Sequence, residues 1–212
     1  MNLQNYYYYF QSVLTPRFCD ELIKYGTAQQ EQLALTGGQT NKIKEGKNLS
    51  EEDLKDLKKK RDSNIVWLND RWIYKEIQPI IHQANKLAGW NFDWDWSESC
   101  QFTKYKLNQF YDWHCDSWDA PYNESNNQNI HGKIRKLSVT CSLSDPKDYK
   151  GGELEFDFRN MEPDKPTVRK CAEIKPRGSI VVFPSHVWHR VKPVTKGNRY
   201  SLVIWNLGYP FK

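Results

Sequence analysis

The 212-residue sequence has no apolar run long enough to cross a bilayer and no low-complexity tract. Its first ten residues are polar and rich in tyrosine, without the basic segment and apolar core of a secretory signal. The five cysteines include no CxxC pair, which argues against a disulfide framework and a zinc knuckle. These absences predict one domain in a reducing, cytoplasmic compartment, with no membrane partner.

The charge balance is only slightly basic, with 31 Lys and Arg against 26 Asp and Glu and a net charge of +5. A weak excess of this kind is typical of a solvated surface rather than of a nucleic-acid-binding face. The one basic run, residues 58–61, stands beside several acidic residues on a predicted helix, which indicates a solvated helix face. Nucleic acid is therefore not predicted as a partner.

The first half of the chain is predicted to be mainly helical. Capping residues followed by apolar periodicity predict helices at about 16–26, 51–60 and 71–88. An aromatic strand at 6–13 precedes them. The segment 31–48 has little periodicity and many Gly, Asn and Lys residues, and we expect a loop there.

The second half changes to the two-residue period of strands. Strands are predicted at 92–97, 101–106, 110–115, 136–143, 179–183, 187–194 and 199–207, and residues 151–156 are predicted to form a turn followed by a further strand. Helices followed by about eight strands predict an α+β, mainly β fold. The expected architecture is a double-stranded β-helix, a cupin-like jelly-roll barrel, supported by N-terminal helices. Within a single domain, 1–212, the helical support would span about 1–97 and the barrel about 98–210.

A histidine and an aspartate two residues apart carry the first functional signal. His114 and Asp116 would share one face of a strand. An imidazole and a carboxylate are two ligands of the 2-His-1-carboxylate triad, which leaves one side of a ferrous ion open. A distant strand must supply the second histidine. We predict His189, which lies inside a predicted strand, with His186, in the preceding turn, as the alternative.

An arginine ten residues after His189 carries the second signal. Arg199 begins the last predicted strand, after a Lys-Gly-Asn turn. Facing the barrel interior, it would be a costly buried charge without an anion, and a guanidinium can bind a carboxylate through two parallel hydrogen bonds. The alternative is a surface residue of the turn. The combination with His114, Asp116 and His189 favours a carboxylate site beside the metal.

These motifs together resemble the Fe(II)- and 2-oxoglutarate-dependent oxygenases, specifically the prolyl 4-hydroxylase-like group. The resemblance covers roughly residues 98–207, and Arg61-x-Ser63 with Trp67 extends it upstream. Its positions, in order, are Tyr105, His114-x-Asp116, Arg135, Leu137, Gly151-Gly152-Glu153-Leu154-Glu155-Phe156, Pro176-x-Gly178, Phe183-Pro184, His189, Val191, Pro193-Val194, Gly197, Arg199 and Trp205.

The resemblance implies an enzyme whose catalytic iron is held by His114, Asp116 and His189. It further implies 2-oxoglutarate bound by Arg199, with a hydrogen bond from Tyr105, and ascorbate as the reductant of the iron. The implied reaction hydroxylates an unactivated C–H bond and releases succinate and carbon dioxide. Peptidyl proline is the family-level substrate, and a small molecule such as a free amino acid is the alternative.

Substrate contacts are predicted among aromatic residues near the site, foremost Trp205 and Trp118. The polar, Asn-rich loop 117–133 directly follows Asp116 and is the kind of segment that serves as a lid ordered by substrate, although the sequence alone does not decide this. Two other classes stay open at this stage. One is a non-catalytic jelly-roll binding module that retains the metal site, and the other is a cupin-like iron enzyme that does not use 2-oxoglutarate.

Overall fold

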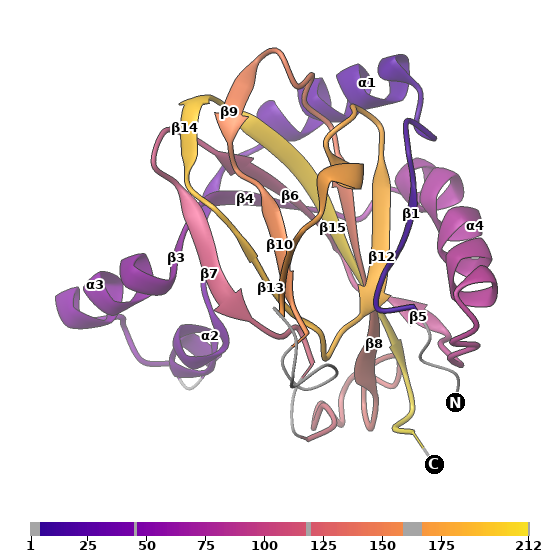
Figure 1. Ribbon diagram of the computed structural model, residues 1–212. Coiled ribbons are helices and arrows are strands. Elements are labelled where there is room, and N and C mark those ends of the chain that lie inside the picture. Colours follow the sequence, from indigo (N-terminus) through magenta and orange to yellow (C-terminus); the bar gives the residue numbers. More distant parts are fainter. Residues whose placement is uncertain (1–4, 45, 118–119, 159–166, 212) are drawn as a thin grey trace.

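The computed structural model describes residues 5–44, 46–117, 120–158 and 167–211 (Figure 1). None of the helices in these ranges is both long and apolar enough to span a lipid bilayer. The helices are α1 (Pro16–Thr27), α2 (Gly37–Lys44), α3 (Glu51–Lys60), α4 (Arg71–Leu87) and a short 3-10 helix, η1 (Ala172–Ile174).

Two antiparallel sheets and a separate strand pair make up the rest of the described chain. The large sheet has the order β1 (Tyr8–Phe10), β12 (Ile180–Pro184), β8 (Ile134–Ser142), β15 (Arg199–Gly208), β6 (Cys100–Tyr105), β4 (Asn64–Leu68) and β2 (Gln32–Leu33), with β5 (Trp96–Ser97) paired to β15. The second sheet has the order β11 (Val168–Lys170), β10 (Leu154–Asp157), β13 (Trp188–Val191), β7 (Phe110–His114) and β3 (Arg61–Asp62). The pair is β14 (Val194–Gly197) with β9 (Tyr149–Gly151).

The alternation of side chains along β12 shows how the sheets are packed. Ile180 and Val182 belong to a core shared with α1 and α4, which cover the outer face of the large sheet (Figure 1). Val181 and Phe183 belong to a second core, together with side chains of β10 and β13. The two sheets therefore face each other across this second core, as the predicted double-stranded β-helix requires.

Strand β15 has the same alternation, but its inner face is polar. Leu202 and Ile204 pack in the core beneath the helices. Arg199, Ser201 and Trp205 have the opposite parity and are all buried. One end of the barrel interior is thus lined by groups that can bind polar ligands.

The segment 31–48 is not the predicted loop, because it contains β2 and α2. Two polar contacts account for the difference. The ammonium group of Lys42 in α2 forms an ion pair with Asp53 of α3, and the guanidinium of Arg61 donates a hydrogen bond to the Leu35 carbonyl, 3.1 Å away. Both contacts join separate segments, so the local apolar period gives no indication of them.

The predicted strand 92–97 is also wrong except for β5. The backbone N–H of Phe92 donates to Oδ1 of Asn85 at 3.0 Å, and the Phe92 carbonyl accepts from Nδ2 of Asn85 at 2.9 Å. A side chain of α4 therefore takes the place of a neighbouring strand. The predicted strand 187–194 is divided, since β13 ends at Val191 and β14 begins at Val194.

Candidate metal centre

Two neighbouring strands of the second sheet bring the predicted histidines together. His114 on β7 and His189 on β13 are direct partners in the strand register, and their ring centroids lie 4.1 Å apart. Their separation in sequence is large, but one antiparallel pairing makes them adjacent.

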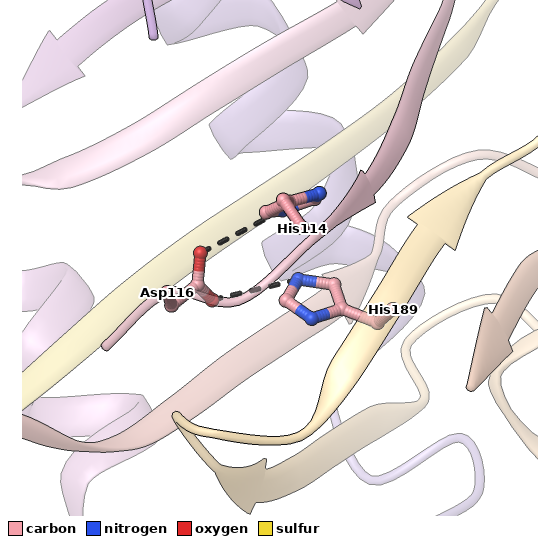
Figure 2. Close-up of side chains that lie close together, drawn as sticks. All are labelled: His114, Asp116 and His189. Carbon is pink, nitrogen blue, oxygen red and sulfur yellow. Dashed lines mark ion pairs between the residues drawn. The ribbon is translucent and has the colours of Figure 1, made fainter. Parts of the chain in front are cut away.

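Asp116 reaches the same point by a different route from the one predicted. Strand β7 ends at His114, so Asp116 does not share a strand face with it. Instead, the backbone N–H groups of Asp116 and Ser117 both donate to the Ser185 carbonyl at 3.0 Å. Ser185 lies in the turn before β13, and this contact directs the carboxylate between the two imidazoles (Figure 2).

The three side chains are spaced to share an ion. Asp116 Oδ1 lies 3.7 Å from Nε2 of His114, and Oδ2 lies 3.5 Å from Nε2 of His189. One ligand atom from each residue falls within 4.8 Å of the others, and no second group of this kind occurs in the described part of the chain. These separations exceed a hydrogen bond and leave room for an ion bonded to all three.

Backbone carbonyls fix both imidazoles in the form that a metal needs. Nδ1 of His114 lies 2.7 Å from the Asp112 carbonyl oxygen, and Nδ1 of His189 lies 3.0 Å from that of Val187. Only a protonated Nδ1 can donate to a carbonyl, so the hydrogen belongs on Nδ1. The lone pair is then on Nε2, which faces Asp116.

The local electrostatics keep the ligands in their metal-binding states. Burial, reinforced by the neighbouring His189, lowers the pKa of His114 well below its ordinary value, so this imidazole is neutral at pH 7. Burial alone would raise the pKa of Asp116. His189, His114, Arg135 and the nearby Trp205 indole outweigh it together and lower that pKa to about 2, so the carboxylate stays ionised.

Arg199 lies inside the barrel, and its interpretation as a surface turn residue is wrong. Its side chain is 3% exposed, and its guanidinium donates to Ser201 Oγ at 3.2 Å. It forms no ion pair with any residue that the structure describes. A cavity of about 310 Å³ reaches Arg199 from outside, and its walls include Lys150, Lys170 and Lys175 together with Glu153, which forms an ion pair with Lys170. The surroundings suit a carboxylate ligand.

Tyr105 shares this polar end of the barrel. The Arg199 guanidinium carbon lies 5.4 Å from the centroid of the Tyr105 ring, and the two residues are register partners on β15 and β6. Burial raises the pKa of Tyr105, opposed by the charges of Arg61 and Arg199. The phenol is thus protonated at neutral pH, and its hydroxyl can donate a hydrogen bond to a carboxylate.

Other predicted residues have different outcomes. His186, the alternative ligand, is exposed in the turn and does not belong to the metal-binding group. Trp205 is buried beneath the guanidinium of Arg135, which lies 3.9 Å from its ring centroid. Trp118 lies outside the described residues. The described part of loop 117–133 folds back on itself, since Tyr122 and Lys133 are joined by a backbone hydrogen bond of 2.9 Å.

Two residues beside the centre were not predicted from the sequence as site residues. The ring of Tyr111 stacks on that of His114, with centroids 3.5 Å apart. The guanidinium of Arg61 lies 4.4 Å from the Tyr111 centroid. Arg61 falls in the upstream part of the family resemblance, which was the only indication in the sequence. Its contact with Tyr111 depends on the pairing of β3 with β7.

The part of the chain that contains His114, Asp116, His189 and Arg199 matches a known protein family. Residues 100–206 match the family model described as the 2OG-Fe(II) oxygenase superfamily. The chain belongs to this superfamily. Family membership implies Fe(II) as the metal and 2-oxoglutarate as the co-substrate, and the donor set His114, Asp116 and His189 fits a ferrous ion.

Curated relatives of this superfamily member are PKHD-type hydroxylases. One from Hyphomonas neptunium is 46% identical over 70 residues, which cover 32% of this chain and 27% of the relative. Another, from Pseudoalteromonas atlantica, is 34% identical over 107 residues, which cover 50% and 41%. The matched residues span less than half the length of each of these relatives.

Solved structures share this fold over nearly the whole chain. A viral collagen prolyl hydroxylase from Paramecium Bursaria Chlorella virus-1 superposes with a TM-score of 0.63 at 21% identity, covering 97% of both chains. A Trichoplax adhaerens prolyl hydroxylase, in complex with a hypoxia inducible factor peptide fragment, gives 0.64 at 17% identity, covering 96% of this chain and 84% of that one. The predicted double-stranded β-helix is confirmed.

Proposed function

We propose that this protein is an Fe(II)- and 2-oxoglutarate-dependent hydroxylase. His114, Asp116 and His189 hold the iron, Arg199 holds the distal carboxylate of 2-oxoglutarate, and the Tyr105 hydroxyl donates a hydrogen bond to the same co-substrate. One observation carries the proposal. Three ligand atoms within 4.8 Å of one another share a barrel interior with a buried arginine that has no acidic partner in the described chain.

The chain's own groups prepare the site for this chemistry. With ferrous iron bound, dioxygen would be the oxidant and 2-oxoglutarate the co-substrate: one oxygen atom would enter the C–H bond of the substrate and the other would enter succinate, with release of carbon dioxide. The carbonyls of Asp112 and Val187 hold the two imidazoles with Nε2 toward the iron. The ring centroids of Phe183 and His189 lie 4.7 Å apart, so Phe183 excludes water from one side of the His189 ring. The protein thus offers three ligands and leaves the other coordination positions to the substrates.

For the substrate, we propose a prolyl residue in a peptide. The structural neighbours are prolyl hydroxylases, one of them in complex with a peptide fragment. Trp205 is buried on the same inner face of β15 as Arg199 and Ser201. The indole nitrogen is buried and has no hydrogen-bond partner in the described residues. Its ring and N–H suit an apolar proline ring and a peptide carbonyl. A free amino acid is the alternative occupant.

Coupled turnover tests the proposal. The protein is incubated with Fe(II), 2-oxoglutarate and dioxygen, with proline-containing peptides in one arm and free amino acids in the other. We expect succinate in a one-to-one ratio with peptide that has gained one oxygen atom, and none with His189→Ala. Turnover with amino acids alone would contradict the peptide substrate. Binding of iron and co-substrate without succinate in either arm would favour the non-catalytic binding module. Ascorbate dependence is measured in the same assay.

A further inference from the structure

Arg61 is a buried cation whose charge is not neutralised by any acidic side chain in the described chain. It is 4% exposed. Its Nε donates to Ser63 Oγ and its Nη1 to the Leu35 carbonyl, both at 3.1 Å. Nη2 is buried and has no hydrogen-bond partner among the described residues. A buried charge in this state costs free energy of folding, so its presence calls for an explanation in the site.

The position of Arg61 connects it to a proposed iron ligand. Arg61 and Tyr111 are register partners in the β3–β7 pairing. The Tyr111 ring is stacked on the His114 ring, at 3.5 Å between centroids and an interplanar angle of 13°. An imidazole at stacking distance fills one face of the phenol ring, so the Arg61 guanidinium, 4.4 Å from the same centroid, must occupy the other face. The three groups form a continuous stack: cation, phenol ring, ligand.

We propose that Arg61 acts on the metal centre by its charge, across the Tyr111 and His114 rings, and that this charge holds the bound iron in the ferrous state. This inference rests on the proposed iron site. A guanidinium stays protonated at any physiological pH, so the charge is permanent. Removal of one electron from the iron adds a positive charge at the far end of the stack. In a water-poor interior, that charge is repelled by Arg61 more strongly than it would be in solvent.

The charge and the packing of Arg61 predict opposite results. If the charge acts, its removal lowers the Fe(III)/Fe(II) midpoint potential and also tightens binding of any divalent ion, because a like charge is gone. If Arg61 only packs against Tyr111, its removal loosens the His114 ring and weakens divalent-ion binding. The direction of the change in metal affinity therefore separates the two roles.

The experiment compares three substitutions of Arg61 with a matched control. Arg61→Gln and Arg61→Met remove the charge, and Met also fills the buried space with an apolar group. Arg61→Lys retains it. The control, Arg190→Gln, removes a guanidinium that stacks 4.5 Å above Trp113 and pairs with Glu155. The midpoint potential is measured on each iron-loaded full-length protein, and Mn(II) affinity is measured by calorimetry as a readout that involves no oxidation.

We expect Arg61→Gln and Arg61→Met to lower the midpoint potential and to bind Mn(II) about tenfold more tightly, the order expected when one unit charge leaves a partly buried site. Arg61→Lys should remain near the wild type, and Arg190→Gln should not differ from it. Weaker Mn(II) binding by all three Arg61 variants would overturn the inference. So would midpoint potentials and Mn(II) affinities of Arg61→Gln and Arg61→Met that equal those of Arg190→Gln. Failure of the wild type to bind iron would instead overturn the proposed function.

Discussion

At the residue scale, the space for Arg199 depends on a residue without a side chain. Gly152 has a φ of +64°, and a Cβ built there would meet Cδ of Arg199 at 2.7 Å and Cγ2 of Val194 at 3.1 Å. The turn between β9 and β10 thus passes directly over the stem of the arginine. Glycine permits both the left-handed backbone and this close approach.

Gly152→Ala should therefore weaken 2-oxoglutarate binding as well as stability. The backbone strain costs about 1 kcal/mol, and displacement of Arg199 adds a loss of co-substrate affinity. Gly46→Ala is the control, because Gly46 has a φ of +73° but nothing within 4 Å of its Cβ position. Calorimetric titration should show weaker binding only for Gly152→Ala. Equal affinities in the two variants would contradict the account.

Arg199→Ala tests the carboxylate site itself. Loss of two charge-assisted hydrogen bonds should weaken 2-oxoglutarate binding by about 3 kcal/mol, or roughly a hundredfold. Iron binding should be nearly unchanged, because Arg199 is not a ligand. The control is Arg177→Ala, which removes an arginine paired with Asp20 rather than one inside the barrel. If Arg199→Ala binds both iron and 2-oxoglutarate as the wild type does, the assignment of Arg199 is wrong.

At the scale of single elements, helix α4 supports the sheet that carries Arg199. Its buried residues Ile73, Ile77 and Ile81 share the core with β8, β12 and β15. The opposite side of the helix is solvated, and Leu87 near its end is 50% exposed. The apolar period of the sequence predicts this amphipathic helix, because one buried stripe is what the period measures.

Ile77→Ala should destabilise the fold by about 3 kcal/mol, through lost apolar burial and the cavity left behind. Leu87→Ala, on the same helix, should change the free energy of unfolding by less than about 0.5 kcal/mol. Urea denaturation monitored by tryptophan fluorescence measures both. Comparable losses in the two variants would show that α4 does not pack on the sheet as described.

Helix α3 begins with a capping box in which Ser50 and Asp53 bond each other's backbone N–H groups. A hydrogen bond from Lys42, followed by those from Ser50, lowers the pKa of Asp53 from 3.8 to about 2. Because the pKa of the folded state is depressed, the stabilisation is present above the ordinary value of 3.8 and is lost as the pH falls toward 2.

A carboxyl titration by NMR should therefore place the Asp53 midpoint near about 2. Lys42→Met should raise it toward its ordinary value, since Lys42 is the largest cause of the shift. Lys47→Met serves as the matched control and should leave it in place. A wild-type Asp53 that titrates at 3.8 would show that α2 does not contact α3 in solution.

Sequence patterns predicted the elements that depend on local period and missed those that depend on distant partners. Most barrel strands were predicted because apolar side chains recur at every second position along them, as Leu137, Val139 and Cys141 do in β8. Helix α2 was missed because its ion pair to Asp53 comes from another segment. The alternating stretch at 92–97 was wrongly predicted to be a strand, because the Asn85 side chain forms hydrogen bonds with the backbone of Phe92 in place of a neighbouring strand. Spacing placed Asp116 near His114, but only the structure shows that the Ser185 carbonyl holds it.

At the scale of the whole molecule, the N-terminal part and the barrel share both sheets. Strand β4 pairs with β6 in the large sheet, and β3 pairs with β7 in the second. The two metal-binding histidines thus lie on β7 and β13 of the second sheet, and β3, from the first half of the chain, forms an edge strand of that sheet. No disulfide joins any of the five cysteines, all of which lie in the described residues. The reducing, cytoplasmic compartment and the single domain remain predictions.

The central claim is that His114, Asp116 and His189 bind one ferrous ion beside 2-oxoglutarate. Anaerobic addition of Fe(II) and 2-oxoglutarate, followed by visible absorption, tests it most directly. We expect a metal-to-ligand charge-transfer band in the wild type and in His186→Ala, and none in folded His189→Ala. A wild type without the band, or a His189→Ala protein that keeps it, would contradict the account.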